Sequence, residues 1–247
     1  PEFDLWSIDR RRYKEYATTK YTVDKAVEVY QNEYAMGFPF EERPAGRPAY
    51  VSPLYEKLKK KGASYGARGG WERPTYFDPK NEVTDHSLSF FRRNGWRKVV
   101  AKEVHAARNG VAILDLPGFT KIEVKGPGAF AYLDNLLCTK LPKVGRISLV
   151  YALLPDGKVL SEFTVARIAD DHFYLVGAAG AEWHDMDVLE AALPADGSVT
   201  LHNISKDFGS LVVVGPHARD VLGRRTVEAP GERQVKTELG EHERIAE

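Results

Sequence analysis

Short apolar runs separated by turn residues recur along the second half of the chain. The clearest pair covers residues 147–154 and 159–168, which flank Pro155-Asp156-Gly157 and predict a β-hairpin. Further strands are predicted at 111–116, 120–125, 172–178, 199–204 and 211–214. Hairpins mixed with single helices, without a regular βαβ repeat, predict an α+β fold with a mostly antiparallel sheet and flanking helices.

Apolar residues at helical spacing predict helices at 22–34, 53–61, 96–108 and 181–192, and one that begins at Pro127. The first of these is expected to be capped by Thr22. Its apolar face is formed by Val23, Ala26, Val27, Tyr30 and Tyr34. The pattern therefore predicts an amphipathic helix near the start of the chain.

Changes in composition divide the sequence into four stretches. Residues 1–45 are aromatic and polar, and residues 46–85 are rich in proline and glycine but also contain Trp71, Tyr76 and Phe77. Aromatic side chains of this size bury large areas, so we expect the second stretch to be an ordered linker. Residues 86–222 contain most of the predicted strands, and residues 223–247 are highly charged, which predicts a poorly ordered tail.

Charge and cysteine content exclude several classes of protein. The 247 residues include 35 Lys and Arg and 35 Asp and Glu, so no excess of cations favours a nucleic-acid partner. A single cysteine, Cys138, excludes an intrachain disulfide, and its apolar neighbours predict a buried, inert thiol. No apolar run reaches the ~20 residues of a membrane helix, so we expect no membrane partner and a cytoplasmic location.

The common catalytic and cofactor motifs do not occur, and the seven histidines show no spacing typical of metal ligands, so no metal site is predicted. One carboxylate, Glu162, lies inside a predicted strand. By alternation it shares a face with Leu160, Thr164 and Ala166, and both faces of the strand carry apolar residues. This predicts burial on both sides and a partner or ligand for Glu162, while a solvent-facing glutamate opposite a lysine remains the alternative.

Three segments of the chain resemble the folate-binding domain of the glycine-cleavage T-protein (aminomethyltransferase) family. They are Val159-Leu160-Ser161-Glu162-Phe163-Thr164-Val165, the pair Leu114-Asp115-Leu116 and Lys121-Ile122-Glu123-Val124-Lys125-Gly126-Pro127, and Val212-Val213-Val214-Gly215-Pro216-His217-Ala218-Arg219. The resemblance implies a T-protein-like folate-binding subdomain over residues 86–222.

The upstream segments resemble the dimethylglycine and sarcosine dehydrogenase family, in which a flavin-dependent domain precedes a T-protein-like one. They include Arg47-Pro48-Ala49-Tyr50-Val51-Ser52-Pro53-Leu54-Tyr55 and Gly70-Trp71-Glu72-Arg73-Pro74. Residues 1–45 would then be the end of the flavin domain and a connector. FAD is expected only through an upstream domain that this chain does not contain, and the second half of the T-protein module is also expected to be absent.

The resemblance implies folate-dependent one-carbon transfer. An N-methyl amine would be oxidised to an iminium on the flavin domain, and tetrahydrofolate would capture the one-carbon unit. Glu162 falls where the family usually has an aspartate and would be the catalytic acid, with Tyr151, Thr164, Ala166 and Ala178 as cofactor-binding residues. The alternative is a non-catalytic module of the same fold that binds a separate flavoprotein subunit. In a eukaryote, the mitochondrial matrix replaces the cytoplasm as the expected location.

Overall fold

The computed structural model describes residues 5–36, 42–83, 95–225, 233–235 and 243–245. The chain divides into two compact units. The five-stranded unit comprises Pro1–Trp6, Phe119–Phe208 and Asp220–Glu247, and the hairpin unit comprises Ser7–Gly118 and Gly209–Arg219. No helix among the described residues is long and apolar enough to cross a membrane.

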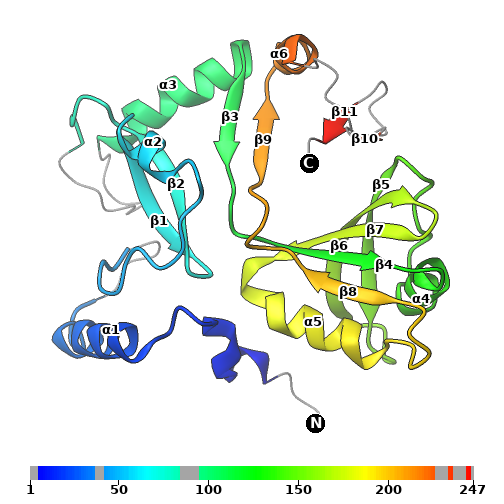
Figure 1. The fold of residues 1–247 in the computed structure, drawn as a ribbon. Helices are drawn as coiled ribbons and strands as arrows, with labels where there is room; N and C mark the ends of the chain where they lie inside the picture. The colour runs from blue at the N-terminus through cyan, green and yellow to red at the C-terminus, as the bar shows by residue number, and fades with distance from the viewer. Residues whose placement is uncertain (1–4, 37–41, 84–94, 226–232, 236–242, 246–247) are drawn as a thin grey trace. The chain divides into compact units, whose positions relative to one another are not determined.

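The five-stranded unit is built on one antiparallel sheet with the strand order β5-β6-β7-β4-β8 (Figure 1). The strands are β4 (Phe119–Lys125), β5 (Ile147–Leu153), β6 (Val159–Ala169), β7 (His172–Ala178) and β8 (Thr200–Asn203). Helices α4 (Ala129–Leu136) and α5 (Glu182–Ala191) accompany it, and a short 3-10 helix, η3 (Ala179–Ala181), precedes α5. The predicted α+β fold with a mostly antiparallel sheet is confirmed.

Both helices cover the same face of this sheet. Leu133 of α4 and Leu189 of α5 are fully buried in one core with the sheet residues Ile122, Val124, Val150, Phe163, Val165, Phe173 and Leu175. The hydroxyl of Tyr132 on α4 donates a hydrogen bond to the carbonyl oxygen of Leu189 at 2.6 Å, which ties the two helices together. Each of these strands therefore has one face in the core, and its other face is left for different contacts.

The hairpin unit contains two small antiparallel sheets. Strands β1 (Ala63–Arg68) and β2 (Trp71–Phe77) form a hairpin, and β3 (Ala112–Asp115) pairs with β9 (Leu211–Val214). Its helices are α1 (Thr19–Gln31), α2 (Tyr55–Lys59) and α3 (Trp96–Asn109), preceded by the 3-10 turn η2 (Arg10–Tyr13). The 3-10 turn η1 (Trp6–Ile8) spans the boundary between the two units in the sequence. A small core joins α3 to β2 through Val99, Tyr76 and Val83.

Two parts of the hairpin unit differ from the sequence prediction. The β1–β2 hairpin was not predicted, because Pro74 and small residues interrupt the alternation, and the register shifts between Ser64 and Tyr65. The prediction that Thr22 caps helix α1 is wrong: the helix starts at Thr19, because the Thr18 hydroxyl accepts a hydrogen bond from the Tyr21 amide at 3.3 Å and caps it.

Helix α6 (Ala218–Arg225) and the antiparallel strands β10 (Arg233–Val235) and β11 (Glu243–Ile245) complete the elements. The predicted poorly ordered tail, residues 223–247, falls largely outside the described residues.

Candidate functional site

The strand register places the five predicted site residues on one face of the sheet. Tyr151 of β5 lies directly opposite Glu162 of β6, and Thr164 pairs with Val176 of β7. Alternation along β6 and β7 adds Ala166 and Ala178 to the same face. We call this face, which is turned away from α4 and α5, the open face.

Exposure differs between the two faces of β6. Phe163 and Val165 are buried in the core, whereas Glu162 and Thr164 are exposed on the open face and Ala166, on that same face, is buried. The prediction that β6 is buried on both sides is therefore wrong. Its open face also carries polar residues, and the helices pack only on the other face.

Glu162 is a solvent-facing carboxylate, and the residue directly opposite it is Tyr151 rather than a lysine. It forms no hydrogen bond or ion pair with any of the residues that the structure describes. An ionised carboxylate can accept several hydrogen bonds, and the neighbouring aromatic ring and hydroxyl add a flat apolar surface and a second polar group. Together, Glu162, Tyr151 and Thr164 can bind a planar molecule that donates hydrogen bonds.

Behind Glu162, a buried hydrogen bond fixes β6 to helix α5. The Ser161 hydroxyl donates to Asp185 Oδ1 at 2.8 Å, and the His184 ring Nδ1 lies 3.3 Å from the same oxygen. Burial raises the pKa of Asp185, against the lowering effect of the hydrogen bonds from Ser161 and His184. A Cβ on Gly177 would lie 2.9 Å from Asp185 Oδ2, so glycine leaves room for this carboxylate.

Ser161 and Asp185 were not predicted as functional residues. The available signal was an acid in the first turn of a predicted helix, but nothing local showed that it would be buried against a strand. The two residues support the backbone next to Glu162 rather than the open face itself.

Three hydrogen bonds hold the turn that follows Ala178. The Thr120 hydroxyl donates to the carbonyl oxygen of Ala178 at 3.2 Å, and the Trp6 indole donates to the carbonyl oxygen of Gly180 at 3.0 Å. At the start of α5, the Asn203 amide donates to Glu182 Oε1 at 2.7 Å. The end of the open face formed by Ala178 is thus held by side chains from β4, β8 and the N-terminal segment.

A second polar group lies on β4 and β7, away from Glu162. Glu123 Oε1 is 2.7 Å from His172 Nε2 and 2.7 Å from Lys125 Nζ. Burial alone would raise the pKa of Glu123, but the hydrogen bonds from Lys125 and His172 outweigh it and lower the pKa. Among the described residues, no group of three or more His, Cys, Asp and Glu side chains could hold a metal ion.

Cys138 is exposed, so the predicted buried thiol is wrong. Helix α4 ends at Leu136, and Cys138 follows in a bend, where its amide donates to the carbonyl oxygen of Tyr151 at 2.8 Å. In this apolar run, Leu137 before Cys138 is buried, but Cys138 itself is not.

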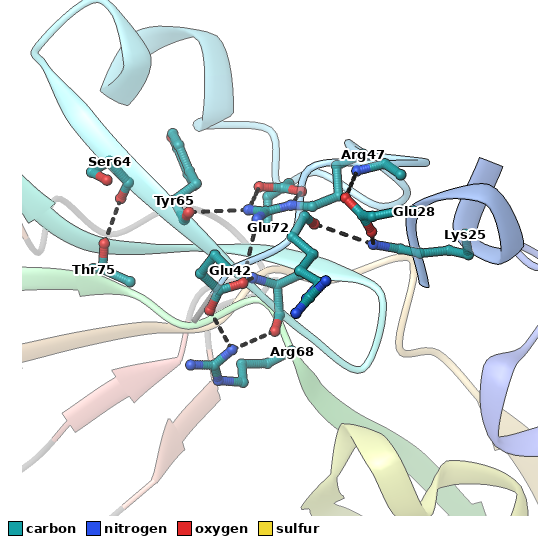
Figure 2. Close-up of polar contacts among 12 residues, drawn as sticks. Lys25, Glu28, Glu42, Arg47, Ser64, Tyr65, Arg68, Glu72 and Thr75 are labelled. Carbon is teal, nitrogen blue, oxygen red and sulfur yellow. Dashed lines mark hydrogen bonds and ion pairs between the residues drawn. The ribbon is translucent and has the colours of Figure 1, made fainter. Parts of the chain in front are cut away.

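The hairpin unit contains a network of ion pairs (Figure 2). Arg47 donates from Nε and Nη2 to the two carboxylate oxygens of Glu72, at 2.8 and 2.6 Å, and from Nη2 to the carbonyl oxygen of Tyr65 at 3.0 Å. Its Nη1 lies 3.3 Å from Glu42, which also pairs with Arg68 at 2.7 Å. The hydrogen bonds to Glu72 raise the pKa of Arg47. These charges pair with one another and hold the 42–47 segment to the hairpin.

Comparison with known proteins places the chain next to two families. The model of the GCVT N-terminal domain matches residues 54–236, and the model of the FAD dependent oxidoreductase central domain matches residues 1–52. These matches confirm the resemblance indicated by the sequence motifs.

Two curated relatives and one solved structure show the extent of the similarity. Dimethylglycine dehydrogenase, mitochondrial, of Mus musculus is 40% identical over 230 residues, which are 92% of this chain and 26% of the relative. The mouse pyruvate dehydrogenase phosphatase regulatory subunit, mitochondrial, is 28% identical over 229 residues, 90% of this chain and 26% of the relative. The crystal structure of glycine cleavage system aminomethyltransferase T from Bartonella henselae aligns with a TM-score of 0.59 and 25% identity, covering 76% of this chain and 47% of that one. The chain thus spans about a quarter of the length of the curated relatives it matches.

Proposed function

The chain belongs to the family of GCVT N-terminal domains, and from this premise we propose that its open face binds tetrahydrofolate for one-carbon transfer. The observation that carries the proposal is the register of β5, β6 and β7. It gathers Tyr151, Glu162, Thr164, Ala166 and Ala178, which are distant in sequence, on one face that the helices leave uncovered.

The residues of the open face fit a pterin in chemical terms. Tetrahydrofolate supplies a nucleophilic amine nitrogen and a flat ring with several N–H donors. The Glu162 carboxylate would accept a hydrogen bond from the ring and hold a proton released during the reaction. Tyr151 offers an aromatic ring for packing and Thr164 a hydroxyl, while Ala166 and Ala178 contribute small side chains to the same face.

Residues 1–52 support a link between this reaction and amine oxidation. Their match to the FAD dependent oxidoreductase central domain favours a flavoprotein domain or subunit as partner, and we assign FAD to that partner. An N-methyl amine of the dimethylglycine or sarcosine type would be oxidised there, and its one-carbon unit would be captured at the open face. Direct passage between the two sites would keep the reactive iminium away from water.

A non-catalytic module that binds a flavoprotein is the second candidate. The observation that favours it is the relative described as a regulatory subunit, which aligns over 90% of this chain at 28% identity. This candidate predicts a stable complex with a flavoprotein but no affinity for tetrahydrofolate.

Isothermal titration calorimetry with tetrahydrofolate under anaerobic conditions distinguishes the two candidates. We expect micromolar binding to the full chain, and at least about tenfold weaker binding of Glu162→Ala, equivalent to about 1.4 kcal/mol. Glu190→Ala is the matched control, because Glu190 is an exposed glutamate on α5, which packs on the opposite face of the sheet. A chain that releases no heat, or equal affinity of the two variants, would contradict the proposed site.

We also propose the domain limits and the location. The limits are those of the sequence prediction: a flavin-domain end at 1–45, a linker at 46–85, a folate subdomain at 86–222 and a tail at 223–247. The mitochondrial names of the mammalian relatives favour the mitochondrial matrix over the cytoplasm if the chain is eukaryotic.

A further inference from the structure

Helix α1 packs on its own unit through the ring of Tyr21, which lies 5.1 Å from the ring of Tyr16, and through polar side chains. Lys25 Nζ donates to Glu28 Oε2 at 2.8 Å and to the carbonyl oxygen of Arg43 at 3.2 Å (Figure 2). Glu28 Oε1 accepts a hydrogen bond from the Ala45 amide at 2.8 Å, and the Asn32 amide donates to the Glu28 carbonyl oxygen at 2.7 Å. Glu28 is the one residue of α1 that is buried.

Four other apolar side chains form an exposed row on a different side of the helix. Val23, Val27, Tyr30 and Tyr34 are 55%, 50%, 78% and 96% exposed. Their spacing of four, three and four residues is the spacing of one helix face, with Tyr34 in the turn after α1. We call these four residues the outer stripe.

Helix α1 is therefore reversed relative to an ordinary surface helix. Such helices bury their apolar stripe and expose their polar one, whereas α1 buries Glu28 and exposes Val23, Val27 and Tyr30. The polar side is already fixed by its hydrogen bonds, so rotating the helix to hide the stripe would break them. A contiguous exposed apolar surface of this kind is typical of a protein interface.

Charged residues lie along the border of the outer stripe, as they do at the rim of a protein interface. Lys20 and Asp24, which lie beside the stripe on α1, form an ion pair at 2.6 Å. Their charges neutralise each other, so the stripe is an uncharged apolar centre beside a polar edge. Such a surface selects an apolar counterpart rather than a charged one.

The family matches identify the kind of counterpart. Helix α1 lies inside residues 1–52, which match only the FAD dependent oxidoreductase central domain, while the GCVT match begins at residue 54. We infer that the outer stripe is the docking surface for the flavoprotein, whose central domain would pack on Val23, Val27, Tyr30 and Tyr34. This inference rests on the proposed function, because it names the surface through which the flavoprotein partner is held.

A pair of identical substitutions on α1 tests the inference. Val27→Glu places a charge in the stripe, and Val29→Glu places the same charge on the same helix at a position that is 62% exposed but outside the stripe. Both residues are exposed in the free chain, so neither change should unfold it. Circular dichroism and thermal unfolding of both variants check this point.

The binding partner in the test is the flavin-containing part of mouse dimethylglycine dehydrogenase, prepared without the region that matches this chain and checked for bound flavin by its visible absorbance. Biolayer interferometry measures its affinity for the full-length chain. We expect wild type and Val29→Glu to bind equally, and Val27→Glu to bind at least tenfold more weakly. Equal affinity of the two variants, or no binding of the wild type to the flavin-loaded partner, would overturn the inference.

Two further measurements separate this inference from its alternatives. Sedimentation of the chain alone tests self-association, and a dimer that Val27→Glu dissociates would assign the stripe to a second copy instead. Titration with tetrahydrofolate should give the same affinity for Val27→Glu and wild type. A wild-type chain that binds the flavoprotein but not tetrahydrofolate would refute the proposed transfer reaction and leave the docking surface in place.

Discussion

Removing the carboxylate of Glu72 should loosen the hairpin unit. Glu72 is 3% exposed and accepts two charge-assisted hydrogen bonds from Arg47, at 2.8 and 2.6 Å. In Glu72→Ala the Arg47 guanidinium stays largely buried and keeps only the carbonyl oxygen of Tyr65 and the longer contact to Glu42, at 3.3 Å. Breaking a buried pair from one side typically costs about 3–5 kcal/mol.

The remaining contacts of Arg47 place the expected cost at the low end of that range. We expect the free energy of opening β1 and β2 to fall by about 3 kcal/mol, a change of about a hundredfold in the opening equilibrium. Glu72→Gln keeps the shape of the side chain and one hydrogen-bond acceptor, so the free energy of opening should fall by about half as much as in Glu72→Ala. Burial also shields the pair from salt, so the difference should persist at high ionic strength.

Hydrogen exchange followed by mass spectrometry measures this local opening in peptides that cover β1 and β2. Glu56→Ala is the control, because Glu56 is exposed on α2 and its removal should change stability by less than about 0.5 kcal/mol. If β1 and β2 exchange no faster in Glu72→Ala than in Glu56→Ala, the ion pair does not hold the hairpin and the reasoning fails.

Two further predictions concern the five-stranded unit. Gly126 has a φ of +127°, and a Cβ there would lie 2.2 Å from the carbonyl oxygen of Ser198. Gly126→Ala should therefore lower the free energy of unfolding, measured in urea, by about 3 kcal/mol. Gly157 has a φ of +83° but no neighbour within 4 Å of such a Cβ, so Gly157→Ala should lower it by only about 1 kcal/mol. Asp185 has a pKa raised from its ordinary value of 3.8 by burial, so its contribution to stability is fully present below that value and is lost as the pH rises through the raised pKa. Urea unfolding at pH 4 and pH 7 should therefore show wild type losing stability relative to Asp185→Asn as the pH rises, and the opposite trend would contradict the assignment.

Local patterns in the sequence predict most of the five-stranded unit. The turn at Pro155-Asp156-Gly157 and the alternation on either side predict β5 and β6, because both signals are contained in about twenty residues. The bounds of β7 and β9 agree with the prediction, 172–178 and 211–214. The β1–β2 hairpin escaped detection because Pro74 lies inside a strand, where its presence normally argues against one.

The local sequence pattern does not show whether a given face of a helix or strand points toward the core or toward solvent. Periodicity places Val23, Val27 and Tyr30 on one side of a helix. The polar side is held by backbone groups of Arg43 and Ala45, which are 18 and 17 residues from their partners on the helix. The same limit applies to β6, where both faces carry apolar residues and only the packing of α4 and α5 decides which is buried. The sequence alone therefore identified Glu162 as unusual, but it wrongly predicted that both faces of its strand are buried.

Trp6 connects the two family matches in one physical contact. It belongs to the segment that matches the oxidoreductase central domain, yet its indole donates to Gly180 and its ring lies 5.7 Å from the ring of His184, both in the GCVT region. Gly180 lies in η3, directly after Ala178 at the end of the open face, and His184 contacts the Asp185 that supports β6. Within the five-stranded unit, Trp6 is thus packed against the same turn and helix that hold the open face. A substitution at Trp6 would therefore act on the turn after Ala178 and on helix α5, the two elements that hold the open face.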